Sequence, residues 1–81
     1  MQKGLIVRVL GLDNFTPKSL ERWHRLIEYD RQQIQENYSA YFIYDNNTKM
    51  TVTSHVTKID EDENNLVLWT DNSIYYIKKL Y

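Results

Sequence analysis

The residues best suited to acid–base chemistry are the two histidines, His24 and His55. A nucleophile needs a base within hydrogen-bonding reach, and nothing in the residue order places Ser54 against an imidazole. Neither histidine has a carboxylate at a spacing typical of a catalytic pair. The two glycines, Gly4 and Gly11, flank an apolar run, so there is no glycine-rich phosphate loop. We therefore predict that the protein is not an enzyme and uses no cofactor.

An acidic run is the nearest approach to a metal site. It comprises Asp60, Glu61, Asp62 and Glu63, followed by Asn64 and Asn65. Oxygens at the first, third and fifth positions are typical of a calcium loop, but Asn65 stands where that loop needs glycine. Asp71, at the twelfth position, replaces the usual glutamate, and the chain has no cysteine for a thiolate site. We interpret the run as a solvated hairpin turn without a metal, whose charge could steer a basic partner.

A basic stripe is the candidate nucleic-acid site. On a helix covering this region, one exposed face would carry Lys18, Arg22, Arg25 and Tyr29. The cations could contact phosphates, and the tyrosine could stack on a base. The same helix would carry four acids, namely Glu21, Glu28, Asp30 and Glu36. A solvated face is therefore the favoured interpretation, and nucleic-acid binding through this stripe is kept as the alternative.

The last predicted hairpin is apolar on both faces. One face carries Leu66, Leu68, Tyr75 and Ile77, and the other carries Val67, Trp69, Ile74 and Tyr76. A domain of this size has one core, so in a curled sheet the second face would point outward. Exposed tryptophan and tyrosine are typical anchors of protein interfaces. We predict that Val67, Trp69, Ile74 and Tyr76 bind a partner protein, with Asp60 to Glu63 adding electrostatic steering; the alternative is that other elements cover both faces.

These candidates must be positioned by a single domain, 1–81, of 81 residues. An apolar strand is predicted over residues 4–12. Thr16 is a suitable N-cap, and Pro17 is favoured at the first position of a helix. Apolar residues then recur at helical spacing, at Leu20, Trp23, Ile27, Ile34 and Tyr38. We predict one long helix over about residues 17–37.

The remainder of the chain is predicted to form strands, over residues 38–45, 49–59, 66–70 and 73–80. The residues between them are typical of turns, and the turn at Asp45–Thr48 tolerates positive φ. In the second of these strands the alternation slips, because Ile59 follows Val56 by three residues. This slip predicts a bulge or a bend. The order β-α-β-β-β-β predicts an α+β fold, either a small SH3-like barrel or an antiparallel sheet packed on the long helix.

Charge and hydropathy restrict the class of partner. A net charge of −1 argues against a wholly basic nucleic-acid binder. No apolar run approaches the roughly 20 residues of a membrane span, and no signal-peptide cleavage site follows the apolar run at Leu5 to Val7. We predict a cytoplasmic protein with no membrane contact. Because a chain of this length buries only about 60% of its unfolded surface, a homodimer would be unsurprising.

The segment 54–77 carries a resemblance. The pattern consists of Ser54 and Val56, then Ile59-Asp60, then alternating residues from Leu66 to Ile77 around Thr70 and Asn72-Ser73. It resembles small uncharacterised proteins, often SH3-like barrels, that phages and mobile elements of low-GC Gram-positive bacteria encode. The resemblance assigns no functional residue to this chain. It implies a non-enzymatic inhibitor or modulator of a host protein, such as a nuclease, a polymerase or a CRISPR or other immune effector, in the cytoplasm of a bacterial host. The alternatives are a nucleic-acid-binding regulator and a self-associating structural component of a virion.

Overall fold

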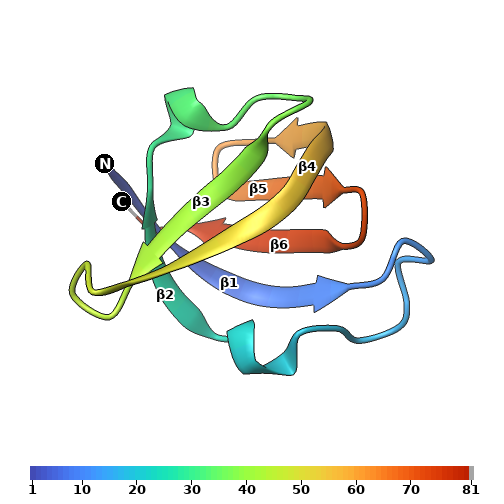
Figure 1. Cartoon of the computed structure of the whole chain (residues 1–81), viewed down its shortest axis with the longest axis horizontal. Helices are drawn as coiled ribbons and strands as arrows, with labels where there is room; N and C mark the ends of the chain where they lie inside the picture. The colour runs from blue at the N-terminus through green and yellow to red at the C-terminus, as the bar shows by residue number, and fades with distance from the viewer. Residues whose placement is uncertain (81) are drawn as a thin grey trace.

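The computed structural model, which describes residues 1–80, is a closed antiparallel barrel of six strands. The strands are β1 (Gln2–Leu10), β2 (Arg25–Tyr29), β3 (Ser39–Tyr44), β4 (Lys49–Glu61), β5 (Asn65–Thr70) and β6 (Ile74–Lys79). Each strand pairs with the next in sequence, and β6 pairs with β1 to close the barrel (Figure 1). The fold is therefore all-β, and it is compatible with an SH3-like barrel.

The predicted long helix is absent, and the α+β prediction is wrong. Residues 17–37 instead contain β2 and two short 3₁₀ helices, η1 (Leu20–Arg22) and η2 (Arg31–Gln33). Pro17 does not begin a helix but forms an isolated bridge with Leu10. Ser19 and His24 have φ values of 50° and 61°, which interrupt any helix at those residues. No helix in residues 1–80 has the length and apolarity needed to cross a membrane.

Barrel closure explains why β2 replaces the helix. Ile27 and Tyr29 alternate inward from β2 and are almost fully buried, whereas Leu20, in the predicted apolar stripe, is 65% exposed. β2 pairs with β1 over five residue pairs, from Gln2 opposite Tyr29 to Ile6 opposite Arg25. Without β2, this edge of β1 would have unpaired peptide groups. Tertiary pairing therefore overrides the helical spacing of the apolar residues.

The core is formed by buried side chains from all six strands and from the segment after η2. They are Ile6, Val9, Ile27, Tyr29, Ile34, Ala40, Phe42, Val56, Leu66, Leu68, Tyr75 and Ile77. At its centre the rings of Phe42 and Tyr75 pack with centroids 5.8 Å apart. Burial of each large apolar side chain contributes about 1.5–3 kcal/mol, and this core carries the fold in a chain that has no cysteine for a disulfide bond.

The four predicted C-terminal strands are present, with ends shifted by one or two residues. β4 is the long strand that crosses the barrel in Figure 1. Its register slips between Val56 and Lys58 against β5, as the broken alternation predicted. A second slip, between Ser39 and Tyr41, occurs against β3. These irregularities let one strand contribute to both sides of the barrel.

Candidate functional site

The outward face of the β3–β4 hairpin carries a cluster of apolar side chains. Tyr41 and Ile43 point outward from β3, directly opposite Val52 and Met50 of β4. Tyr41, Met50 and Val52 are 49%, 56% and 47% exposed. We call these four residues the hairpin face. Such a cluster of exposed apolar side chains is more informative than single exposed residues, because a folding core does not require it.

The inward positions in the first part of β4 are occupied by threonines that have structural hydrogen bonds, whereas Val56 further along the strand faces the core. Thr53 is buried beside the register slip between β3 and β4. Its Oγ1 accepts a hydrogen bond from the Ala40 amide at 2.9 Å and donates one to the Ser54 carbonyl at 2.7 Å. Thr51 Oγ1 accepts a long hydrogen bond of 3.4 Å from Arg25. These polar residues of β4 therefore face the interior for structural reasons, and the apolar ones between them are left outside.

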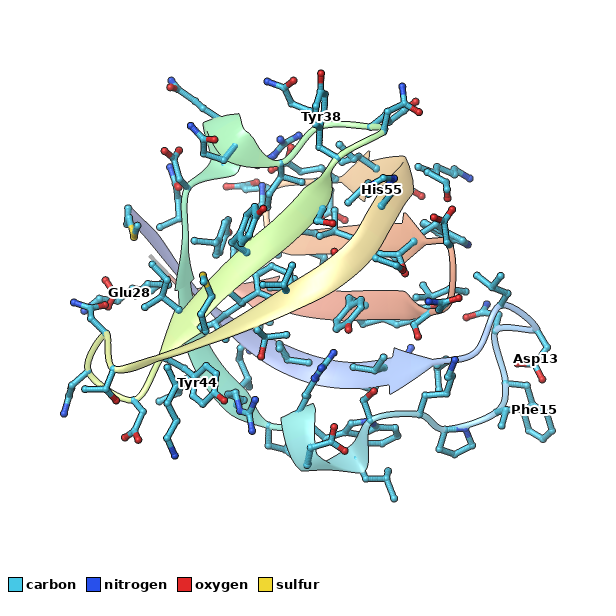
Figure 2. All side chains as sticks on the ribbon, viewed as in Figure 1. Asp13, Phe15, Glu28, Tyr38, Tyr44 and His55 are labelled. Carbon is cyan, nitrogen blue, oxygen red and sulfur yellow. The ribbon has the colours of Figure 1, made fainter. Side chains whose placement is uncertain are left out.

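The hairpin face is bordered by polar groups at both ends. At the turn between the strands, Lys49 Nζ lies 3.6 Å from a carboxylate oxygen of Asp45, and both side chains are well exposed. At the other end, Tyr38 and His55 line a shallow hollow on the surface together with Tyr41. Figure 2 shows Tyr38 and His55 at this end of the molecule, away from Tyr44 and Glu28. No charged residue belongs to the hairpin face itself.

The predicted anchors on the last hairpin are only partly available. As predicted, Leu66, Leu68, Tyr75 and Ile77 form its buried inner face. Val67, Trp69 and Tyr76 are half-buried on the outside. Ile74 was predicted to be an exposed anchor, but it is fully buried. It lies opposite Leu10 of β1, at the end of the barrel where the Leu10–Pro17 bridge closes the following loop.

The two aromatic rings on this outer face each lie beside a cation. The Lys58 ammonium is 4.6 Å from the ring centre of Trp69, and the Arg8 guanidinium is 4.3 Å from that of Tyr76. The Tyr76 hydroxyl also donates a hydrogen bond to Asn14 Oδ1. Cation–π contacts of this kind contribute about 0.5–1 kcal/mol at exposed sites. The outer face of β5–β6 therefore presents less free apolar surface than the sequence predicted.

Only the second half of the acidic run lies in the predicted turn: Asp60 and Glu61 end β4, and Asp62 and Glu63 lie between β4 and β5. The Asp62 carboxylate accepts hydrogen bonds from the amides of Asn64 and Asn65, which lower its pKa. Glu61 accepts hydrogen bonds from Lys79 at 2.6 Å and Arg31 at 3.1 Å. The bond from Lys79, followed by that from Arg31, holds the pKa of Glu61 below its usual range.

The other two acids of this run, Asp60 and Glu63, are exposed. Among residues 1–80, no group of three or more histidine or acidic side chains is placed to hold a metal ion.

The predicted basic stripe does not form. Lys18 Nζ donates to the Asn72 carbonyl, and Arg22 donates to the Tyr75 hydroxyl. The Arg25 guanidinium lies 4.0 Å from the ring centre of Tyr44. Tyr29, predicted to stack on a base, is 2% exposed and belongs to the core. With the helix absent, Lys18 lies before η1, Arg22 ends η1, and Arg25 and Tyr29 stand at opposite ends of β2, so the four side chains do not share one exposed face.

The two histidines are exposed and separated in the fold. His24 lies in the turn before β2, where its amide donates to the Ile6 carbonyl at 2.6 Å, and His55 lies on β4. No hydrogen bond joins either imidazole to a carboxylate within residues 1–80. The hairpin face was not predicted, although the alternation of Met50 and Val52 with Thr51 and Thr53 contains the signal. Such an alternation is ordinarily interpreted with its apolar residues facing the core.

Comparisons with known proteins found no family model, no curated protein and no solved structure that matches this chain.

Proposed function

We propose that this chain is a non-enzymatic protein-binding domain that contacts its partner through the hairpin face. The observation that carries the proposal is the inverted pattern of β4, with Met50 and Val52 outside and Thr51 and Thr53 inside. A strand selected only for stability would place its apolar residues in the core. Tyrosine provides a rigid aromatic anchor, and methionine adapts its shape to a partner surface.

The partner is expected to present an apolar surface. The hairpin face has no charge of its own, so binding there depends on apolar burial and should weaken little as salt increases. In keeping with the resemblance of residues 54–77, we expect a host or phage protein whose activity the binding inhibits or modulates. Nucleic-acid binding has less support, because Lys18, Arg22 and Arg25 make contacts within the barrel.

The test is an affinity capture from a low-GC Gram-positive lysate, after nuclease treatment and at high salt. The wild-type chain is compared with the double variant Met50→Lys/Val52→Lys. Thr57→Lys is the matched control, because Thr57 is also exposed on β4 but lies outside the hairpin face. A single stoichiometric protein that is bound by the wild type and the control, and lost from the double variant, supports the proposal. Equal capture by all three chains contradicts it.

Trp69→Ala, in the same capture, tests the outer face of β5–β6. Loss of the captured protein from this variant alone, with the fold intact, would move the site to Val67, Trp69 and Tyr76. Capture that disappears on nuclease treatment would favour a nucleic-acid-binding regulator instead. Concentration-dependent self-association that Met50→Lys/Val52→Lys abolishes, with no captured protein, would favour a structural component.

A further inference from the structure

Two rows of outward side chains lie in or beside a groove that runs along β3 on the side away from β4. It lies over β1 and β2 and is bordered by the Ile43–Asn46 segment and by Leu80. The first row runs across four segments in the order Leu80, Lys3, Glu28 and Ile43. Each neighbour in this row is fixed by strand pairing: Lys3 lies opposite Glu28, and Glu28 lies opposite Ile43.

The second row lies two residues further along the strands. Leu5 is opposite both Lys78 of β6 and Leu26 of β2. Leu26 also borders the groove, as does Asp45 at the start of the β3–β4 turn. The order of this row is therefore Lys78, Leu5, Leu26 and Asp45. Leu26 and Leu80 are 66% and 41% exposed, so the groove contains substantial apolar surface in contact with water.

The charges in the groove have few partners within the chain. Among residues 1–80, no ion pair involves Lys3, Glu28 or Lys78, and Asp45 pairs only with the exposed Lys49. Lys3 is exposed and Glu28 is partly so. Figure 2 shows Glu28 projecting away from the barrel at this side. Two opposite charges thus lie side by side in the groove, between the apolar side chains of Leu80 and Ile43.

Each row matches the same row read in the opposite direction: charges then meet opposite charges, and apolar residues meet apolar residues. The first reads apolar, positive, negative, apolar, and the second reads positive, apolar, apolar, negative. A two-fold axis parallel to the strands and between β1 and β2 reverses each row on the facing copy. Lys3 then faces Glu28 of the second copy, Leu5 faces Leu26, Leu80 faces Ile43 and Lys78 faces Asp45. We propose that two copies of this chain form a symmetric dimer through this groove.

A second copy fits the groove because of this charge pattern. In a two-fold interface every contact occurs twice, so a surface must match itself. The reversed rows place each charge against its opposite and each apolar residue against another. A standard interface takes about 800 Å² from each partner, which is a modest part of the 5180 Å² surface of this barrel. Of the hairpin face, the interface takes up Ile43 alone, and Tyr41, Met50 and Val52 stay outside it. The inference rests on the groove and does not depend on the proposed function.

Charge reversal tests the pairing directly. Sedimentation velocity of the purified chain is recorded from about 1 μM to about 1 mM, a range that covers weak to moderate affinities. The wild type should show a concentration-dependent dimer. In a dimer of Lys3→Glu, two carboxylates would face each other at each contact between position 3 of one copy and position 28 of the other. In a dimer of Glu28→Lys, two ammonium groups would face each other at the same contacts. Each single variant should therefore be monomeric. In an equimolar mixture, one variant supplies two carboxylates and the other two ammonium groups. In the mixed pair, both contacts between position 3 of one copy and position 28 of the other therefore join a carboxylate to an ammonium group, so the mixture should dimerise.

Glu63→Lys is the matched control, because it makes the same charge change as Glu28→Lys at an exposed position in the β4–β5 turn. It should dimerise like the wild type. Near-ultraviolet circular dichroism confirms that each variant remains folded. The inference is overturned by a wild type that is monomeric throughout the range, by single variants that still dimerise, or by a mixture of folded variants that stays monomeric.

Discussion

Buried threonine side chains form hydrogen bonds to backbone groups where the regular pairing of strands is interrupted. Thr53 is the clearest case, since its hydroxyl occupies the slip between β3 and β4 and satisfies the Ala40 amide. Thr70 has a similar role in the β5–β6 turn, where its Oγ1 donates to the Ser73 carbonyl and accepts from the Ser73 amide. A buried amide without a partner is costly. These threonines therefore stabilise the fold, whereas the exposed apolar residues beside Thr53 remain available for binding.

Thr53→Val should destabilise the barrel although the side chains have almost the same shape. The Ala40 amide would lose its hydrogen-bond acceptor in a buried site, at a cost of about 1–3 kcal/mol. Urea unfolding followed by tryptophan fluorescence measures the free energy of unfolding. Thr57→Val, at an exposed position of the same strand, should change it by no more than about 0.5 kcal/mol. Equal effects of the two substitutions would show that the Thr53 hydroxyl does not support the register slip.

Glu61 should make the stability depend on pH in the acid range. Its folded pKa lies below the ordinary value of 4.5 because Lys79 and Arg31 stabilise the carboxylate. Because the folded pKa is lowered, the contribution of Glu61 to the free energy of unfolding is complete above the unfolded pKa. It is lost as the pH falls through the folded pKa. For this partly exposed cluster we expect about 1 kcal/mol or less at neutral pH.

The measurement is the free energy of unfolding of the wild type and of Glu61→Gln from pH 7 to pH 3. The wild type should be the more stable at pH 7, and the difference should shrink as the carboxylate is protonated. A difference that stays constant over this range would mean that the ion pairs with Lys79 and Arg31 do not stabilise the fold.

At the scale of elements, the strands were predictable and the segment between β1 and β3 was not. Alternation and turn residues identified β3 to β6 and the slip after Val56, because these signals are local. Residues 17–37 also satisfied local rules for a helix, with Pro17 after an N-cap and apolar residues at helical spacing. What decides their structure is the closure of the barrel by β2, which depends on β1 and β3. No local pattern contains that information.

The same limit applies to the candidate sites. The inner face of the last hairpin was predicted correctly, since Leu66, Leu68, Tyr75 and Ile77 alternate in two adjacent strands. The burial of Ile74 was not predictable, because it depends on the loop that the Leu10–Pro17 bridge closes. The hairpin face was missed because apolar residues that alternate with threonine are usually assigned to the core.

The β3–β4 turn is an element whose conformation can be tested separately. Asp45, Asn46 and Asn47 have φ values of 55°, 56° and 67°, so three successive residues adopt the left-handed region. Asparagine and aspartate tolerate this region, whereas a β-branched residue does not. Asn46→Val should therefore lower the free energy of unfolding by about 1–2 kcal/mol.

Asn46→Gly is the control for this turn, because glycine adopts positive φ without steric cost. It should leave the thermal midpoint close to that of the wild type, whereas Asn46→Val should lower it by several degrees. Equal midpoints for the two variants would contradict the left-handed conformation of the turn.

At the scale of the whole molecule, barrel closure leaves two surfaces with distinct properties. The hairpin face is apolar and uncharged, and the groove over β1 and β2 combines apolar and charged residues. They adjoin at Ile43, which belongs to the hairpin face and borders the groove. In a two-fold dimer the free parts of both hairpin faces would remain exposed, so one assembly could bind two partner molecules.

Site-specific photocrosslinking shows whether the hairpin face contacts a partner. A benzophenone amino acid replaces Tyr41 in one chain and Phe15 in another. Phe15 is 81% exposed on the loop after β1, at the far side of the barrel from the hairpin turn (Figure 2). Irradiation in a low-GC Gram-positive lysate should give one discrete protein adduct from position 41 and none from position 15. No adduct at position 41, or the same adduct from both positions, would contradict partner binding at the hairpin face.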